Sequence, residues 1–387
     1  MKKKIAILGS TGSIGKNLIK ILKEDLNKFE IILLTANKNY KSLLSQAKIL
    51  KVKNIIITDK KKYFECLKNN QRKKIKIYNN FNHFNKIFRS KIDYTMSAIS
   101  GLDGLLPTLK IIKFTRKIAI ANKEGIICGW NLLNKELLRY KTKFLPVDSE
   151  HFSIWYALKN NKDLVDKVTL TASGGPFYNL PLKKFNDIKI NDALNHPNWK
   201  MGKKISIDSA TMMNKVFEII EAKNIFNLNY KKLRILNHPK SYVHGIVQFN
   251  NGMSKIIIHD TNMKVPIFNT LYSDTIKKKI KSKNLRIDIL NDLSLKEVDY
   301  KKFPLVKILK IMPNNYSLFE TVIVSANDTL VSLFLNNKIK FTDIAKKLNK
   351  IISLKEFNKY KKLRPKNIQD IINLYKLVRL KINIKSI

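Results

Sequence analysis

The segment "KIAILGSTGSIGKNLIKIL" (residues 4–22) constrains the fold of this chain more than any other stretch. Its pattern predicts a buried strand, a glycine-rich turn from Gly9 to Gly15 and an amphipathic helix. Glycines in such a turn let the backbone approach a pyrophosphate, and the N-terminus of the helix attracts the negative charge. The spacing is GxxGxxG, and a Gly/Ser turn without a ligand is the plain alternative. The place between a strand and a helix favours a dinucleotide site.

More apolar strands follow in "FEIILLTANK", "VKNIIITD", "DYTMSAIS" and "RKIAIANKEG", with helical stretches between several of them. This alternation predicts an α/β fold with a Rossmann-like, doubly wound parallel sheet in residues 1–146. We expect a second, α+β catalytic domain in residues 147–280, in which the long polar stretch 173–203 is a lid. A linker at 281–304 and a helical C-terminal domain at 305–387 complete the predicted organisation.

The end of the second strand indicates the type of nucleotide. An NAD site needs an acid there for the ribose 2′-hydroxyl, but the chain offers Asn37, Lys38 and Asn39. A cation flanked by amides suits the 2′-phosphate of NADP, although Lys38 could also be one more surface lysine. We therefore predict NADPH as the cofactor.

The charge balance of the chain is unusual. Lys and Arg number 75 against 29 Asp and Glu, which gives a net charge of +46. Such a charge suits a nucleic-acid partner, but the lysines are spread along the chain without clusters of interleaved aromatics. A composition imposed by an A+T-rich genome explains the charge better, so we expect no nucleic-acid partner. With two cysteines and no apolar run of about 18 residues, we expect a cytoplasmic protein without a membrane segment.

The stretch "VDSEH" (residues 147–151) places two acids two positions apart. In an extended segment the side chains of Asp148 and Glu150 would point the same way. Two adjacent carboxylates repel each other unless a cation lies between them, and Mg²⁺ or Mn²⁺ prefers such oxygen ligands. The pair therefore indicates a metal site or an acid/base pair.

A third acid is available in "SATMMNKVFEIIEA", which is predicted to form a helix from about Ser209. Asn214, Lys215 and Glu218 would share one face of that helix. Glu221 lies one turn further, and spacing alone leaves both glutamates open as metal ligands. An exposed amphipathic helix is the plain reading, but amide, ammonium and hydroxyl donors beside a carboxylate also suit a phosphate.

The chain resembles the 1-deoxy-D-xylulose 5-phosphate reductoisomerase family. The motifs "GSTGSIG", "GLLPTL", "ANKE", "LPVDSEH", "SGGPF", "HPNWKMGKKISIDSATMMNK", "FEIIEA" and "HPKSYVHGIV" occur in the order typical of that family. The resemblance implies a homodimeric enzyme of the non-mevalonate isoprenoid pathway that binds a small phosphorylated substrate. It would rearrange the substrate by a retro-aldol/aldol path and reduce the product with NADPH to 2-C-methyl-D-erythritol 4-phosphate.

The resemblance also implies roles for individual residues. A divalent cation (Mn²⁺, Mg²⁺ or Co²⁺) would be held by Asp148, Glu150 and Glu218, which chooses Glu218 over Glu221. The residues implied in catalysis are Lys123, Glu150 and His196. The residues implied in substrate binding are Lys123, Ser149, Glu150, Ser173, His196, Ser209, Asn214, Lys215 and Glu218. The residues implied in nucleotide binding are Thr11, Gly12, Ser13, Ile14, Asn37, Lys38, Asn39, Asn122, Glu124 and Gly202.

The chain departs from the family pattern at three places. Asn37 stands where the family usually has glycine, and we expect the loop to survive because asparagine tolerates a positive φ. Gly125 replaces a serine, which we expect to loosen its loop slightly. The family's "NAANE" motif appears as "VSANDT" (residues 324–329). Another NADP-dependent semialdehyde or homoserine-type dehydrogenase is the alternative function, but it would not need both "VDSEH" and "MMNKVFE".

Overall fold

The computed structural model describes residues 1–70, 75–159, 165–273, 279–280 and 287–384. The chain divides into two compact units. The first unit comprises Met1–Gly125, Leu132–Asp148 and Met263–Lys281. The second unit comprises Ile126–Asn131, Ser149–Asn262 and Ser282–Ile387.

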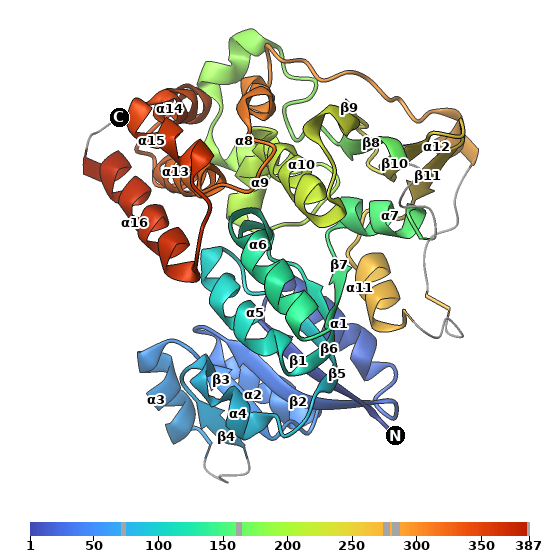
Figure 1. Cartoon of the computed structure of the whole chain (residues 1–387), viewed down its shortest axis with the longest axis vertical. Helices are drawn as coiled ribbons and strands as arrows, with labels where there is room; N and C mark the ends of the chain where they lie inside the picture. The colour runs from blue at the N-terminus through green and yellow to red at the C-terminus, as the bar shows by residue number, and fades with distance from the viewer. Residues whose placement is uncertain (71–74, 160–164, 274–278, 281–286, 385–387) are drawn as a thin grey trace. The chain divides into compact units, whose positions relative to one another are not determined.

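The first unit is built on a parallel sheet (Figure 1). Within the described residues this sheet has seven strands in the order β4-β3-β2-β1-β5-β6-β7, and every neighbouring pair is parallel. The strands are β1 (Lys3–Leu8), β2 (Phe29–Ala36), β3 (Asn54–Ile57), β4 (Lys76–Tyr78), β5 (Ile92–Ser97), β6 (Thr115–Ile120) and β7 (Lys143–Pro146). The strand order reverses between β1 and β5, so right-handed crossovers place helices on both faces. The predicted doubly wound sheet is confirmed.

The helices of the first unit connect these strands. They are α1 (Ser13–Lys23), α2 (Tyr40–Ile49), α3 (Lys60–Lys68), α4 (Phe84–Ile87), α5 (Leu105–Ile112) and the two ends of α6 (Lys123–Arg139). The middle of α6, Ile126–Asn131, is assigned to the second unit and contains the non-helical Gly129. Short 3₁₀ turns occur at Phe81–His83 and Leu102–Gly104. In α1 the buried side chains, such as Leu18 and Leu22, recur at helical spacing, which is why this segment packs as an amphipathic helix.

Helix α11 (Lys264–Leu271) also belongs to the first unit, whereas the predicted boundary placed residues 263–280 in the second domain. Its Thr270 hydroxyl lies 3.0 Å from the hydroxyl of Tyr94 in β5, and Tyr272 donates a hydrogen bond of 2.8 Å to Asp25. These contacts join segments far apart in the sequence. Apolar residues at helical spacing indicate that one face of a helix is buried, but they do not indicate which sheet buries it.

The second unit contains a mixed sheet. Among the described residues it has four strands in the order β11-β10-β8-β9, and only the pair β8 and β9 is parallel. The strands are β8 (Val165–Ala172), β9 (Leu233–Asn237), β10 (Val243–Phe249) and β11 (Ser254–Ile258). The accompanying helices are α7 (Ser149–Ala157), α8 (Ile190–Leu194), α9 (Lys203–Ala210) and α10 (Met213–Phe226), with 3₁₀ turns at Leu182–Asp187 and Tyr230–Lys232. The predicted α+β character is confirmed.

The C-terminal part is helical, as predicted, and packs within the same second unit. Its elements are α13 (Phe319–Leu335), α14 (Phe341–Ser353), α15 (Lys355–Asn358) and α16 (Ile368–Ile384), with 3₁₀ segments at Pro304–Ile311 and Lys359–Lys362. Of the predicted linker 281–304, residues 281–286 lie outside the described residues. The rest contains α12 (Ile287–Asn291) and a bridge from Lys296 to Asn237 of β9.

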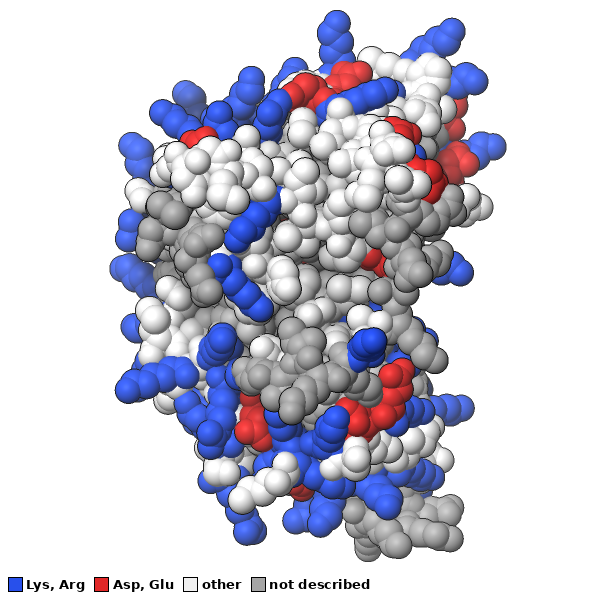
Figure 2. Space-filling model, turned by 90° about the vertical axis from the view of Figure 1, so that its right-hand side faces the viewer, with Lys and Arg blue, Asp and Glu red and all other residues white. Residues whose placement is uncertain are grey.

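The face of the molecule drawn in Figure 2 carries many basic residues. Figure 2 shows lysine and arginine side chains scattered over the visible face, with acidic side chains between them. In the part of the chain that the structure describes, no helix is both long enough and apolar enough to cross a bilayer.

Candidate active site

The glycine-rich loop joins β1 to α1 at the point where the strand order reverses. Gly9 has a φ of +83°, and a Cβ atom there would lie 2.6 Å from the carbonyl oxygen of Ala98. A Cβ atom on Gly15 would lie 2.5 Å from the carbonyl oxygen of Gly9. No side chain caps the N-terminus of α1 at Gly12. The loop therefore combines a glycine-dependent close turn with a helix N-terminus suited to an anion.

The three residues after β2 are exposed and lie at the same sheet edge, because β2 is the parallel neighbour of β1. Asn39 caps α2 by accepting a hydrogen bond of 3.2 Å from the Ser42 amide. Asn37 donates a hydrogen bond of 2.8 Å to Thr58, and it is not among the residues with a positive φ. Asparagine in place of glycine therefore causes no backbone strain. Lys38 is left facing solvent between the two amides.

The residues after β6 form a tight helix cap. The side chain of Asn122, which is 2% exposed, accepts from the amide of Gly125 and donates 2.6 Å to the carbonyl of Gly101. A Cβ atom on Gly125 would lie 2.2 Å from the Asn122 side-chain oxygen. Glycine therefore fits this cap without a clash, and the expected loosening at Gly125 stays a prediction. Glu124 lies in the first turn of α6, and the Lys123 ammonium donates 2.9 Å to Asp148.

Glu150 lies in a helix, which corrects the extended conformation considered for "VDSEH". Helix α7 begins at Ser149, whose carbonyl accepts a hydrogen bond of 2.8 Å from the Ser153 hydroxyl four residues later. The apolar residues that follow, such as Phe152, are buried along the helix. Asp148 precedes α7 by one peptide bond, so the chain itself keeps its carboxylate near the start of the helix that carries Glu150.

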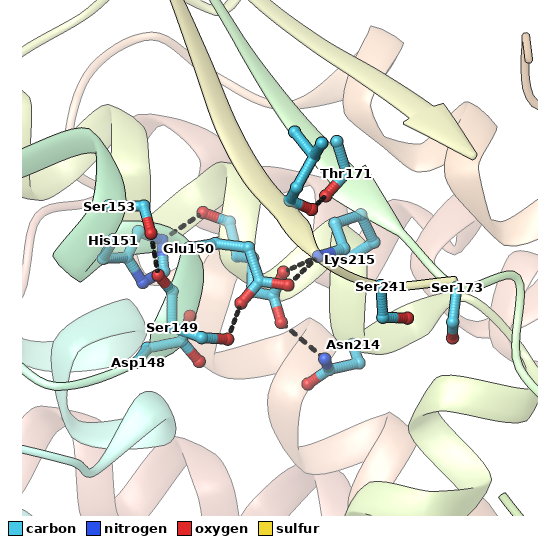
Figure 3. A network of polar contacts seen from close by, with 12 residues as sticks. Asp148, Ser149, Glu150, His151, Ser153, Thr171, Ser173, Asn214, Lys215 and Ser241 are labelled. Atoms are coloured by element: carbon cyan, nitrogen blue, oxygen red, sulfur yellow. Dashed lines mark hydrogen bonds and ion pairs between the residues drawn. The ribbon is translucent and has the colours of Figure 1, made fainter. Parts of the chain in front are cut away.

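A buried lysine joins two of the predicted acidic ligands (Figure 3). The ammonium of Lys215 donates 2.7 Å to Glu150 and forms an ion pair with Glu218. The amide of Asn214 donates 2.5 Å to the other oxygen of Glu218, and Ser149 donates to Glu150. Burial alone would lower the pKa of Lys215, but the two carboxylates outweigh it and hold that pKa above its ordinary value. Lys215 is thus an ammonium between two carboxylates.

Glu218 and Glu221, which spacing left open, have different surroundings. Glu218 shares Lys215 with Glu150, whereas the Glu221 carboxylate lies 4.0 Å from Nδ1 of His151. The other ring nitrogen of His151 lies 2.8 Å from the backbone carbonyl of Glu218 and therefore donates to it. Helix α10 thus directs Glu218 toward Glu150 and Glu221 toward the histidine.

His196 and Ser173 form a second polar group. Nδ1 of His196 accepts hydrogen bonds of 3.1 Å from the amides of Asn198 and Trp199, which places the proton on Nε2. That nitrogen lies 3.0 Å from the hydroxyl of Ser173 and donates to it. Burial lowers the pKa of His196 to about 4, so the ring is neutral near pH 7. It can therefore donate a hydrogen bond to an anion but carries no charge.

Ser241, which the sequence reasoning did not single out, is joined to this polar group. Its hydroxyl accepts a hydrogen bond of 3.0 Å from Asn198, which connects it to His196 and through that ring to Ser173. Figure 3 labels Ser173 and Ser241 together with Lys215. Ser241 has a φ of 58°, which is uncommon for a residue other than glycine and marks a held conformation. The motif "HPKSYVHGIV" contained this serine, but its backbone conformation has no sequence signal.

The stretch 173–203, predicted as a lid, consists of two differently packed parts. Phe177 and Phe185 are buried, and their rings pack against Phe341 of α14 with centroid distances of 5.1 and 6.1 Å. This first part is anchored to the C-terminal helices. In the later part, residues 195–202 have no regular secondary structure, and Trp199 contacts the ring of His244 edge-on at 6.1 Å.

The predicted site residues therefore fall into separate groups. Those from Thr11 to Ile14, from Asn37 to Asn39, and from Asn122 to Glu124 lie at the carboxyl edge of the first unit's sheet. Ser149, Glu150, Asn214, Lys215 and Glu218 are joined by hydrogen bonds and ion pairs within the second unit. Ser209 lies in α9, and Gly202, a predicted nucleotide contact, caps the start of that helix in the second unit rather than in the first.

Comparison with known proteins identifies the family. The model of 1-deoxy-D-xylulose 5-phosphate reductoisomerase matches residues 5–129, and models of C-terminal domains of that enzyme match residues 144–226 and 259–381. A 1-deoxy-D-xylulose 5-phosphate reductoisomerase of Pelagibacter ubique (strain HTCC1062) is 62% identical over 388 residues, with full coverage of both chains.

Solved structures agree with the sequence matches. The reductoisomerase from Zymomonas mobilis in complex with NADPH is 30% identical, with a TM-score of 0.88 and full coverage of both chains. A DOX-P reductoisomerase in complex with NADPH, fosmidomycin and magnesium is 29% identical, with a TM-score of 0.90, and the match covers 99% of this chain and 98% of that one. These matches span the whole chain at identities well above those that indicate only a shared fold. The chain therefore belongs to the 1-deoxy-D-xylulose 5-phosphate reductoisomerase family.

Proposed function

We propose that this chain converts 1-deoxy-D-xylulose 5-phosphate into 2-C-methyl-D-erythritol 4-phosphate, using NADPH and a divalent cation, in the non-mevalonate isoprenoid pathway. The observation that carries the proposal is the ion pair of Lys215 with both Glu150 and Glu218, in a chain that belongs to this family. A buried and a half-buried carboxylate beside a set of neutral donors suit a metal-dependent reaction of a phosphorylated sugar.

The cation would be held by Asp148, Glu150 and Glu218. The donor set fits, because hard divalent cations prefer carboxylate oxygens and because a cationic group already balances two of the three acids here. When bound, such a cation polarises the substrate's carbonyl and hydroxyl oxygens. A related reductoisomerase structure contains magnesium, and we propose that Mn²⁺ or Co²⁺ also fits this oxygen site.

The phosphate of the substrate would be bound by hydroxyl, imidazole, amide and ammonium donors. These donors come from Ser173, His196, Ser209, Asn214, Lys215 and, in addition, Ser241. The neutral His196 supplies one N–H donor, and Lys215 supplies the point charge. Lys123, Ser149 and Glu150 would contact the reacting end of the substrate, where Lys123 is already held by Asp148.

NADPH would bind along the carboxyl edge of the first unit's sheet. Its pyrophosphate would meet Thr11, Gly12, Ser13 and Ile14 at the start of α1. Its 2′-phosphate would meet Lys38 beside Asn37 and Asn39. Asn122, Glu124 and Gly202 complete the proposed nucleotide contacts. When bound, the cofactor supplies the hydride, and the residues of this chain fix its position.

We also propose a homodimer in the cytoplasm. The family resemblance supports the dimer. The two cysteines of the chain, Cys66 and Cys128, are buried and are not joined in a disulfide, which agrees with a reducing compartment.

The proposed function is tested by following NADPH oxidation with 1-deoxy-D-xylulose 5-phosphate, with and without Mn²⁺. We expect turnover only when the substrate and the metal are both present. Turnover of a semialdehyde without added metal would instead support the alternative dehydrogenase. The variant Glu218→Gln is the internal control, since it keeps the shape of the side chain and removes the charge that the cation needs.

A further inference from the structure

A charged network within the second unit ties α9 to the C-terminal helix α13. The ammonium of Lys204 lies 2.9 Å from Asp208 in its own helix and 3.0 Å from Asp328 in α13. The amide of Asn327 donates 2.8 Å to the other oxygen of Asp208. The hydroxyl of Tyr375 in α16 donates 2.9 Å to the second oxygen of Asp328.

The ammonium of Lys204 is the cation that Asp208 and Asp328 share. Asp208 is 1% exposed and Asn327 is 0% exposed, so neither can be solvated by bulk water. Without the ammonium, the two carboxylates would face each other across the contact between α9 and α13 and repel. The ammonium of Lys204 therefore acts together with the Asn327–Asp208 hydrogen bond to hold the two helices together at this point.

Helix α9 is also the anchor of the segment that passes Trp199. Residues 195–202 end at Gly202, which is the N-cap of α9, and Lys204 lies in the first turn. The same helix carries Ser209, one of the proposed phosphate donors. The start of the predicted lid packs on this helix too, because a Cβ atom on Gly175 would lie 2.8 Å from the carbonyl oxygen of Ser209.

We propose that Lys204 is a positioning residue for substrate binding. By pairing with Asp328, it fixes α9 to α13 and so sets the position of Ser209 and of residues 195–202. It touches neither substrate nor cofactor, and it acts through the helix. The proposal rests on the proposed function, because it assumes that Ser209 meets the substrate phosphate.

The first test needs no ligand. Hydrogen–deuterium exchange of the full chain is compared for Lys204→Met, Asp328→Asn and the control Lys203→Met, which changes the neighbouring exposed lysine. We expect exchange in residues 195–210 to rise about tenfold in the first two variants and to stay unchanged in the control. The double variant should be no worse than Lys204→Met alone, because that single change already removes the ion pairs with both Asp208 and Asp328. Unchanged exchange in Lys204→Met and Asp328→Asn would overturn the proposal.

The second test separates positioning from general stability. With 1-deoxy-D-xylulose 5-phosphate, the KM of Lys204→Met should rise about tenfold. The affinity for NADPH measured by fluorescence titration should fall much less, since Gly202 is the one proposed nucleotide contact in the displaced segment. Equal losses of substrate and NADPH affinity together with a lowered Tm would overturn the proposal, since they indicate a merely structural role. If the unmodified chain fails to turn over this substrate, the proposed function is wrong, and the exchange experiment still decides whether Lys204 fixes the segment.

Discussion

The ammonium nitrogen of Lys215 lies 2.7 Å from a carboxylate oxygen of Glu150, and the same ammonium pairs with Glu218. A side-chain cation thus lies between two of the acids proposed to hold the metal. A divalent cation would compete with Lys215 for these oxygens. Lys215 is also a proposed phosphate contact. If the metal takes over the carboxylates of Glu150 and Glu218, the ammonium of Lys215 becomes available to the phosphate. Metal and substrate binding should therefore support each other.

Replacement of Lys215 by methionine should change metal and substrate affinity in opposite directions. Removing the competing ammonium should strengthen Mn²⁺ binding about tenfold or more, since a charge-assisted contact contributes about 1.5–3 kcal/mol. The substrate KM should rise because the phosphate loses its point charge. Isothermal titration with Mn²⁺ alone, followed by steady-state kinetics, measures both effects.

The matched control for this prediction is Lys223→Met. Lys223 is equally buried and lies in the same helix, but its ammonium faces the ring of Tyr316 at 4.5 Å. The Lys223→Met variant should therefore bind Mn²⁺ with unchanged affinity. If Lys215→Met binds Mn²⁺ no more tightly than the unmodified chain, the ammonium does not compete with the metal.

The two glutamates of α10 should differ in their effect on the metal. Glu218→Gln should weaken Mn²⁺ binding by about two orders of magnitude and reduce kcat strongly, because a charged ligand is lost. Glu221→Gln should leave Mn²⁺ affinity nearly unchanged, since Glu221 lies beside His151 instead. Metal titration of both variants decides the matter. The reverse result would show that the wrong glutamate was chosen.

Strand and helix patterns were sufficient to predict the parallel sheet, because buried parallel strands appear as continuous apolar runs. The assignment of α11 to the first unit was not predictable. It depends on the contact of Thr270 with Tyr94, which are 176 residues apart. The helical start at Ser149 was also missed, since "VDSEH" contains too few residues to distinguish a strand end from the first turn of a helix.

Lys38 should determine the preference for NADPH over NADH. Its side chain is exposed between two asparagines, where a 2′-phosphate would be met by a cation and not by an acid. One charge-assisted contact contributes about 1.5–3 kcal/mol, so Lys38→Ala should lower the preference by about ten- to a hundredfold. The ratio of kcat/KM for the two cofactors measures it, with the exposed Lys41→Ala as control. Equal use of both cofactors by the unmodified chain would refute the prediction.

His196 should reduce stability in mild acid. Burial lowers its pKa from 6.5 to about 4 in the folded chain, so the unfolded chain binds more protons between these values. The free energy of unfolding must then fall as the pH falls from about 6.5 toward 4. In His196→Asn this contribution to the fall of the unfolding free energy with pH should be absent. Urea unfolding at a series of pH values measures it. Identical slopes for both proteins would contradict the neutral assignment of the ring.

The motifs predicted which residues line the site, but the hydrogen-bond and ion-pair partners of these residues could not be derived from the sequence. The pairing of Lys215 with Glu150 joins residues 65 positions apart, and the contact of His196 with Ser173 joins residues 23 positions apart. No sequence signal indicated a role for Ser241 beyond its place in the motif "HPKSYVHGIV", which begins with a histidine–proline turn. Long-range contacts depend on the packing of whole elements, which local patterns do not encode.

When substrate binds, Trp199 should leave its present contact with His244 and cover the substrate. The Trp199 ring contacts His244, and the Trp199 backbone amide donates a hydrogen bond to His196, a proposed phosphate donor. Binding of the phosphate at His196 should therefore change the position of the tryptophan. Because Phe177 and Phe185 anchor the first part of the predicted lid, only residues 195–202 should close. A phosphonate inhibitor should therefore shift the intrinsic fluorescence and protect this segment from proteolysis, while the segment around Phe185 stays protected throughout. Trp130 and Trp155 can contribute to the signal, so the shift must disappear in Trp199→Phe. If protection of residues 195–202 is the same with and without inhibitor, and Trp199→Ala leaves KM and kcat unchanged, this tryptophan is a fixed packing residue and the segment is not a lid.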